Sequence, residues 1–308
     1  MGNHEIMNSN RINQRKAYVL ALAAVLFWST MSSAFKITLR FIQFDQLLLW
    51  SSLFGIIALF IINQISNKRL TLADINIRAL VSSAIMGLFN PFLYYLILFK
   101  AYDMLEAQIA GALNYTWPIA LVLLSIPLLK QKIKVVSIVA IFISFFGIII
   151  ISTNGNLKDF EVANPLGVAL AVGSAFFWAI YWILNMKDQR EETGKILLNL
   201  FFGFIYILIY LIITGVTIKI PTQNAIYGAI YIGVFEMSIT FVIWLKALNY
   251  SVNTAKVSNL IYLSPFFALF WINFMVGETI RTSTIVGLFL IVFGIAFQQF
   301  LDVKQKSE

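Results

Sequence analysis

Residues 87–102 read GLFNPFLYYLILFKAY, and residues 233–248 read GVFEMSITFVIWLKAL. Each stretch begins with a glycine, Gly87 or Gly233, and has a phenylalanine two positions later and a lysine near its end. Both are almost unbroken apolar runs without the alternation of apolar and polar residues that a membrane β-barrel requires. The two stretches are therefore predicted to be membrane helices, and their likeness predicts a chain built from two similar halves.

The composition of the whole chain favours a membrane protein. Of the 308 residues, 60% are hydrophobic and only 12% are charged, whereas about a quarter of an ordinary soluble domain is charged. The chain has no cysteine, and its one histidine, His4, lies in the polar N-terminal tail. Disulfides, thiolate metal sites and a buried histidine relay are therefore excluded. The net charge of +8 does not indicate nucleic-acid binding, because the basic residues stand at the ends of apolar runs.

The predicted fold class is an all-α polytopic membrane protein with ten transmembrane helices, each close to the about 20 residues that a bilayer core requires. The predicted segments are 17–36, 45–65, 79–100, 106–129, 135–152, 165–186, 196–216, 224–247, 254–276 and 283–301. With a cytoplasmic N-terminus, 16 of the 22 Lys and Arg residues lie on the cytoplasmic side and 6 on the external side. Such an excess marks cytoplasmic loops, so both termini are predicted to be cytoplasmic.

An internal repeat relates the two halves. Further aligned pairs, in the same order, are Trp28 with Trp178, Lys100 with Lys246, and Pro118 with Pro265. Because each half holds five helices, an odd number, the halves enter the membrane from opposite sides, as in many secondary transporters. The predicted organisation is an N-terminal tail (1–16), a first repeat (17–152), an external linker (153–164), a second repeat (165–302) and a C-terminal tail (303–308).

Glu236 stands deep inside the second quoted stretch. It follows Thr222 by 14 residues and precedes Lys246 by 10, or about 21 and 15 Å of helix. A charge that faces lipid at such depth costs about 2.5–3.5 kcal/mol. The helical stripe through it is mostly small or polar: Ala229, Gly233, Thr240, Ile243 and Ala247. We expect Glu236 to face the bundle interior, either as a site for a proton or a cationic group or as a protonated residue that only packs helices.

Prolines and aromatic residues mark further candidate positions. Pro118 in NYTWP (114–118) removes a backbone donor and frees the carbonyl of Asn114, and broken helices near a repeat interface often bind substrate. Simple proline kinks with small-residue packing are the alternative. One helical face of segment 165–186 carries Trp178, Tyr181, Trp182 and Asn185. This stripe could stack a ligand or attract its ammonium group, or it could be ordinary core packing.

Motifs for catalysis or nucleotide binding are absent from the sequence. Neither a GxxxxGK[ST] loop nor a G-x-S-x-G elbow occurs. The longest predicted connections, 66–78 and 153–164, are too short for a catalytic domain. The sequence therefore predicts no enzyme, no catalytic residue, no metal site and no cofactor.

Four short motifs, in this order, resemble the drug/metabolite transporter (DMT) superfamily and, more narrowly, its EamA-domain transporters. They are LFWSTM (26–31), NYTWP (114–118), SPFFALF (264–270) and GE (277–278). LFWSTM and NYTWP are also similar to the bacterial aromatic amino-acid exporter group, and the resemblance covers about 17–302. It implies a basket of helices around a central cavity, with the fifth and tenth segments at the periphery, in the cell inner membrane.

The candidate substrate-binding residues combine this resemblance with the patterns above. They are Trp28, Ser32, Asn90, Tyr94, Asn114, Trp117, Trp178, Tyr181, Glu236, Asn259 and Tyr262, with Pro91, Pro118 and Pro265 as hinges. The chain departs from the family pattern at KQK (130–132), where the first repeat would carry GE, and at Glu236, where a small residue is common. The second departure indicates a cationic or zwitterionic cargo.

The sequence as a whole predicts an inner-membrane secondary transporter that works by alternating access. It is expected to export a small amphipathic metabolite, with an amino acid, aromatic ones included, as the leading cargo. The expected partners are this small molecule and the lipid bilayer, without nucleic acid, and a homodimer stays open. The alternatives are a proton-coupled exporter of cationic drugs or amines and, from another class, a lipid flippase or scramblase.

Overall fold

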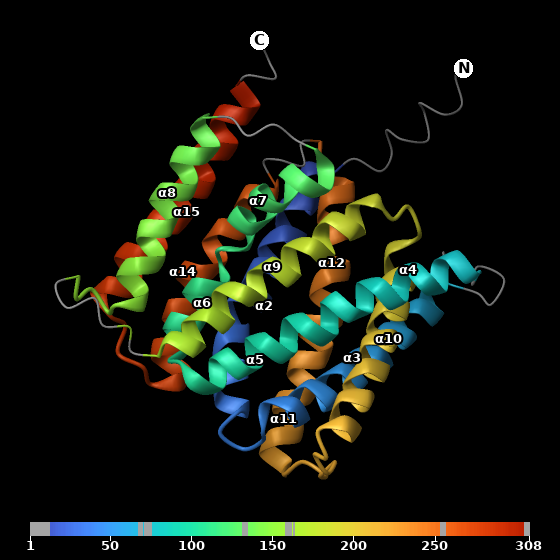
Figure 1. Ribbon diagram of the computed structural model, residues 1–308. Helices are drawn as coiled ribbons and strands as arrows, with labels where there is room; N and C mark the ends of the chain where they lie inside the picture. The colour runs from blue at the N-terminus through green and yellow to red at the C-terminus, as the bar shows by residue number, and fades with distance from the viewer. Residues whose placement is uncertain are drawn as a thin grey trace, which may run out of the picture.

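The computed structural model of the chain describes residues 13–66, 70, 76–130, 135–157, 162, 164–252 and 257–304. Over these residues all regular secondary structure is helical (Figure 1). The predicted tails, the connection 66–78, the linker 153–164 and the KQK motif lie partly outside the described residues.

The helices follow the predicted segments in order. In the first half they are α2 (Gln14–Thr38), α3 (Phe44–Ile65), α4 (Ile77–Gly87), η2 (Leu88–Leu93), α5 (Tyr94–Met104), α6 (Ala107–Asn114), α7 (Trp117–Leu129) and α8 (Val135–Ser152). In the second half they are α9 (Pro165–Lys187), α10 (Glu192–Ile213), α11 (Gln223–Tyr231), η3 (Ile232–Ile239), α12 (Thr240–Tyr250), η4 (Asn259–Leu263), α14 (Ser264–Trp271), η5 (Ile272–Val276) and α15 (Thr282–Lys304).

The membrane-spanning character of these helices confirms the predicted fold class. Among the described residues, 8 helical stretches are long and apolar enough to cross a membrane, and shorter apolar helices lie at Ile138–Ser152 and Thr282–Phe297. Together they fill the ten predicted positions. At α10 the boundary differs by four residues, because the helix begins at Glu192 rather than at 196. The side chain of Glu191 accepts a hydrogen bond from the backbone N–H of Gly194 at 2.8 Å and caps the helix there.

The two halves are inserted in opposite directions. α2 begins beside the end of α12, because the backbone N–H of Asn13 donates to the carbonyl of Tyr250 at 2.9 Å. α2 ends beside the end of α5, because the Lys36 ammonium donates to the carbonyl of Tyr102 at 2.8 Å. The equivalent helices α5 and α12 therefore end at opposite ends of the bundle, as an odd number of helices in each half requires.

Glycines bring helices of the two halves together at equivalent places. Gly87, at the end of α4, lies against Gly203 of α10, and its aligned partner Gly233 of η3 lies against Gly55 of α3. A methyl group on Gly233 would overlap the carbonyl oxygen of Ser51. Because α3 packs on η3, α5 on α9 and α2 on α12, the halves interleave rather than stand as separate bundles.

α8 and α15 form a pair at one side of the bundle, where Figure 1 shows them lying side by side. Gly147 of α8 faces Gly287 of α15, and a methyl group on either would overlap the carbonyl oxygen of the other. Small residues allow such close approach between membrane helices. The pair also joins the two halves, since α8 belongs to the first and α15 to the second.

Candidate functional site

A cavity of about 300 Å³ lies between the two halves. The described residues that line it are Trp28, Met31, Ser32, Phe35, Tyr94, Leu98, Tyr102, Gly111, Asn114, Tyr115, Trp117, Leu121, Trp178, Trp182, Met186, Glu236, Trp244, Leu248, Ser258, Ile261, Tyr262 and Ser264. All but Tyr115 and Ser258 come from α2, α5, α6 and α7 of the first half and from α9, η3, α12, η4 and α14 of the second. The cavity is therefore built by the repeat interface.

Among the described residues, the cavity lining is more exposed at one end of the bundle than at the other. Met186, near the end of α9, is 55% exposed, and Tyr262 is half-buried. At the other end Phe35 and Tyr102 are only 3% and 2% exposed. We call the end at which α9 and α12 terminate the open end. We call the opposite end, where α5 terminates and α6 begins, the closed end.

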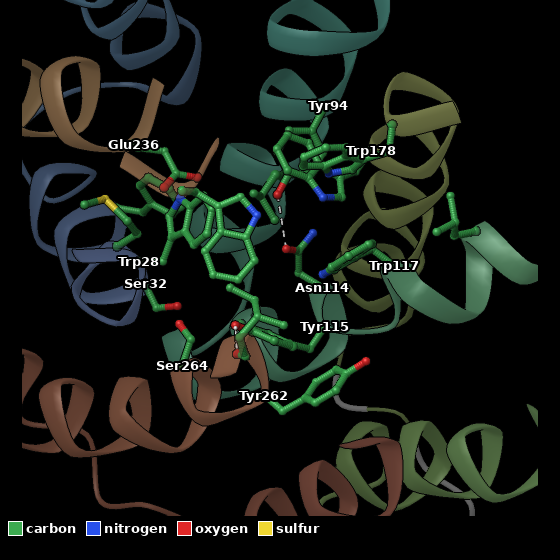
Figure 2. A pocket seen from close by; sticks show the side chains of 18 of the residues that line it. Trp28, Ser32, Tyr94, Asn114, Tyr115, Trp117, Trp178, Glu236, Tyr262 and Ser264 are labelled. Atoms are coloured by element: carbon green, nitrogen blue, oxygen red, sulfur yellow. Dashed lines mark hydrogen bonds between the residues drawn. The ribbon is translucent and has the colours of Figure 1, made fainter. Parts of the chain in front are cut away.

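Aromatic rings form much of the cavity wall. The ring centroid of Trp178 lies 4.7 Å from that of Tyr94 and 5.6 Å from that of Phe241, and Trp28 lies 5.7 Å from the same Phe241. Figure 2 shows Glu236 and Trp28 on one side of the cavity, with Tyr94 and Trp178 across from them. Rings in this arrangement can pack against the apolar part of a ligand and attract a cationic group.

Glu236 is the one charged side chain among the described residues that line the cavity. It is 7% exposed, and the Tyr95 hydroxyl donates to its Oε1 at 3.0 Å. Its Oε2 has no hydrogen-bond partner among the described residues, and none of the ion pairs between them includes Glu236. A buried carboxylate oxygen without a partner is unfavourable, so a ligand that brings a donor, above all an ammonium group, would pair with it.

A wide π turn at η3 changes which residues follow Glu236 along the wall. A regular helical period predicts Ile243 and Ala247 on its face, but Trp244 and Leu248 line the cavity instead. A π turn holds more residues than an α-helical turn, so the face beyond η3 is displaced by one position. Glu236 faces inward as expected, and Thr240 and Ala247 of its stripe are also buried, but Trp244 and Leu248 are the residues that line the cavity beyond η3.

The helical segments that carry Pro118 and Pro265 break where they meet the cavity. α6 ends at Asn114, and α7 begins at Trp117 with Pro118 in its first turn. In the second half η4 gives way to α14 at Ser264, with Pro265 in the first turn. Proline suits this position because the missing N–H has no intrahelical partner there. The two breaks present Asn114, Trp117 and Ser264 to the cavity.

Asn114 is held in place by neighbours on two other helices. The Tyr94 hydroxyl donates to Asn114 Oδ1 at 3.2 Å, and Asn114 Nδ2 donates to Ser174 Oγ of α9 at 3.0 Å. The side-chain amide is therefore part of a bridge between the two halves. It can offer a ligand its remaining lone pair and its second N–H.

The structure brings most of the predicted substrate-binding residues to the cavity, namely Trp28, Ser32, Tyr94, Asn114, Trp117, Trp178, Glu236 and Tyr262. Asn90 and Tyr181 do not reach it. They line a smaller void of about 10 Å³ together with Pro91 and Tyr95. Asn90 leaves helical geometry, with φ −146° and ψ 119°, and so places the break of this helix just before Pro91. Asn259 is exposed on η4 and lines neither space.

Several wall residues are not among the sequence-based candidates, including Met31, Phe35, Tyr102, Tyr115, Trp244 and Ser264. Tyr115 and Ser264 belong to or adjoin the proline motifs, which carry a usable signal. Tyr102 follows Tyr94 at twice the four-residue spacing of a helical face, so the same face could have been extended to it. Trp244 follows the π turn, and no period in the sequence points to it.

The polar groups of the site fit reversible binding. Within the described ranges, no group of three or more His, Asp or Glu side chains could hold a metal ion. The wall offers one carboxylate, one amide and several hydroxyl groups among aromatic and aliphatic side chains. These groups recognise a small molecule by hydrogen bonds and charge.

Comparisons with known proteins agree with this architecture. The profile of the EamA-like transporter family matches residues 15–153 and 165–298. A Clostridium kluyveri protein described as an uncharacterized transporter is 25% identical over 291 residues, which cover 91% of this chain and 92% of the relative. The uncharacterized transporter YoaV of Bacillus subtilis is 25% identical over 293 residues, or 92% of this chain and 97% of YoaV.

One solved crystal structure has a similar fold. It superposes with a TM-score of 0.67 at 17% identity and covers 95% of this chain and 99% of that chain. At this identity the likeness shows the fold alone. The family profile, in contrast, matches both halves of the chain in turn. The chain therefore belongs to the EamA-like transporter family and is a multi-pass membrane transporter.

Proposed function

We propose that the chain is a secondary transporter that exports a small amphipathic metabolite by alternating access, with an amino acid, aromatic ones included, as the leading cargo. The observation that carries this proposal is the cavity chemistry. Glu236 stands among aromatic rings, and none of the described lining residues is basic. A cargo amino group would pair with the carboxylate, and an apolar or aromatic body would pack against Trp28, Tyr94 and Trp178.

The size of the cavity favours a small solute over a lipid. Pockets for small molecules span about 300 to 1,000 Å³, and this cavity, at about 300 Å³, lies at the lower limit. It has room for one amino acid or a compact amine but not for a phospholipid. Because the wall closes around it at one end, the cavity also differs from the open groove that a scramblase needs.

Export and an inner-membrane location are supported by the distribution of basic residues. With both termini in the cytoplasm, 16 of 22 Lys and Arg residues lie on that side. In this orientation the open end faces the cytoplasm, where a metabolite is made and would enter the cavity. The oppositely inserted, interleaved halves support a second state in which the other end opens.

A second cargo class, cationic amines or drugs exchanged for protons, is favoured by one observation. The carboxylate group of an amino acid would find no basic partner among the described wall residues and would rely on neutral groups such as Asn114 and Ser264. An amine without a carboxylate group needs no such partner. A carboxyl group at membrane depth that alternates between a proton and an amine would couple the two fluxes.

Three compounds that share an indole ring would separate these cargo classes. Tryptophan carries an amino and a carboxylate group, tryptamine only the amino group and indole-3-propionate only the carboxylate. We expect the purified protein to be stabilised against thermal unfolding by compounds that carry the amino group and not by indole-3-propionate. Stronger stabilisation by tryptophan than by tryptamine supports amino-acid transport, and the reverse order supports amine transport. Stabilisation by indole-3-propionate alone would contradict both cargo classes. For a compound that does bind, measuring its uptake into inverted vesicles would test whether it is also transported.

A further inference from the structure

A carboxylate from the second half caps a helix of the first half at the closed end. The side chain of Glu278, just after η5, accepts hydrogen bonds from the backbone N–H of Ala107 at 2.7 Å and of Gln108 at 3.1 Å. These are the first residues of α6. Amides in the first turn have no intrahelical acceptor, and the helix dipole favours negative charge there. We call this contact the carboxylate clamp.

Gln108 ties the same two segments together. Its side chain is buried, at 1% exposure, and its Nε2 donates to the carbonyl of Thr279 at 3.0 Å. Its Oε1 accepts from the backbone N–H of Arg281 at 2.9 Å and from the Thr284 hydroxyl at 3.0 Å. The Arg281 guanidinium in turn pairs with Glu106. A buried amide with all these groups paired fixes the first turn of α6 against the loop before α15.

The carboxylate clamp lies just beyond the sealed part of the cavity. Gly111, one turn further along α6, lines the cavity, and a methyl group there would lie 2.8 Å from Ser32 Oγ and 3.0 Å from the Tyr102 hydroxyl. Those two hydroxyl groups share a hydrogen bond of 2.7 Å. Opening this end requires α6 to move away from Ser32 and Tyr102. It cannot do so while its first turn is bound to the second half.

The sequence does not repeat the carboxylate clamp at the open end. Gly277 and Lys130 are equivalent in the register that aligns the two helix-breaking prolines, and both adopt left-handed backbone angles, with φ 81° and φ 53°. Glu278 follows Gly277, whereas Gln131 follows Lys130. A neutral amide cannot supply the charge that favours a helix N-terminus. Residues 131–134 lie outside the described part of the chain.

We propose that Glu278 is a positioning residue of the transport cycle, whose carboxylate clamp on α6 holds the closed end shut and makes the state open at the other end the resting state. This assignment rests on alternating access but not on the identity of the cargo. The equivalent position at the other end is the uncharged Gln131, so the sequence does not repeat this charged contact there. Removal of the charge should therefore let the closed end open more often without any cargo.

Cysteine accessibility tests this directly, since the chain has no cysteine of its own. An Asn114→Cys variant places one thiol at mid-cavity, where a membrane-impermeant maleimide can be added to intact cells or to inverted vesicles. We expect labelling from the face at the open end and slow labelling from the other face. Adding Glu278→Gln should raise the rate from the face at the closed end about tenfold, because charge-assisted hydrogen bonds are roughly twice as strong as neutral ones.

Two further variants keep the test decisive. Asp103→Asn removes an exposed carboxylate at the same end, which among the described residues forms its one ion pair with Lys100, and should leave both rates unchanged. Glu278→Asp keeps the charge on a shorter side chain and should give a smaller rise than Glu278→Gln. Glu278→Gln protein that labels from the open end as before, with no increase at the closed end, overturns the proposal. If the Glu278→Gln variant is labelled from neither face, the Glu278→Asp variant is used instead. An unchanged labelling rate of that variant from the face at the closed end would then overturn the proposal.

Discussion

Replacing Glu236 by Gln should weaken the binding of amine-bearing compounds while it leaves the shape of the cavity unchanged. Gln has the same size, and its carbonyl oxygen can still accept the hydrogen bond that Tyr95 donates at 3.0 Å. The exchange removes the negative charge and replaces the unpaired Oε2 by an N–H₂ group. A ligand ammonium group then meets a donor where it would have met an acceptor.

The size of the loss follows from the position of the carboxylate. At 7% exposure the side chain is screened little by water, and two unit charges about 4 Å apart attract by about 4 kcal/mol at an effective dielectric constant of about 20. Desolvation of both groups offsets part of this attraction. A net contribution of about 1.5–3 kcal/mol, as for hydrogen bonds to charged groups, corresponds to a loss of about 10- to 150-fold in affinity.

Calorimetric titration of the purified protein would measure this loss. Tryptamine should bind the Glu236→Gln variant far more weakly than the parent, whereas an uncharged indole of similar size should bind both alike. Ser32→Ala, which alters an uncharged wall group, is the matched control and should leave the preference for the amine intact. Equal tryptamine affinity in parent and Gln variant, from mildly acidic to mildly alkaline pH, would refute the assignment of Glu236 as the amine site.

Three further predictions concern stability and are measured by thermal unfolding in detergent. Gly233→Ala should destabilise the protein by about 1–3 kcal/mol, because the added methyl group overlaps the facing helix. Gly173→Ala, which has open space around it, should leave the stability unchanged or raise it. Equal effects of the two substitutions would count against the close contact at Gly233. Tyr95→Phe should cost about 1–3 kcal/mol by removing the donor to Glu236, and it should cost clearly less in a Glu236→Leu background, where no acceptor remains. Burial alone would raise the pKa of Asp188, but hydrogen bonds and charge from Arg190 outweigh it and hold the pKa below its ordinary value of 3.8. The stabilising contribution of Asp188 is therefore present above pH 3.8 and is lost as the pH falls through the lower folded-state pKa. Asp188→Asn should therefore destabilise the protein at neutral pH and not in strong acid. A stability difference between parent and variant that persists in strong acid would contradict this.

The architecture could be predicted because each of its signals is carried by many residues at once. Ten apolar stretches of bilayer length need no tertiary information, and the aligned glycines and prolines order the halves without a structure. The structure then shows why those glycines recur, since Gly87 and Gly233 make the equivalent contact with α10 and α3. The inward direction of Glu236 follows from the cost of placing a charge in lipid, which local sequence is enough to reveal.

The details of the cavity wall depend on features that a helical period does not contain. The π turn at η3 brings Trp244 rather than Ile243 to the wall. Asn90 occupies the place in the first half that Glu236 has in the second, yet the break before Pro91 leaves it in the smaller void. Asn259 and Tyr262 are three residues apart in η4, a 3₁₀-helix in which this spacing keeps side chains on one face, yet only Tyr262 lines the cavity.

The interleaving of the two halves also bears on how the chain is made. Gly55 of α3 packs against η3, and Gly87 of α4 packs against α10. Both partners are synthesised later than the helices that they contact. We therefore expect the first five helices to be inserted into the membrane before their packing partners exist. Their packing is completed only when the last five helices have been inserted. We therefore expect a nascent chain cut after α8 to lack a stable fold, because α3 and α4 would lack their partners, whereas two separately translated halves in one membrane should assemble.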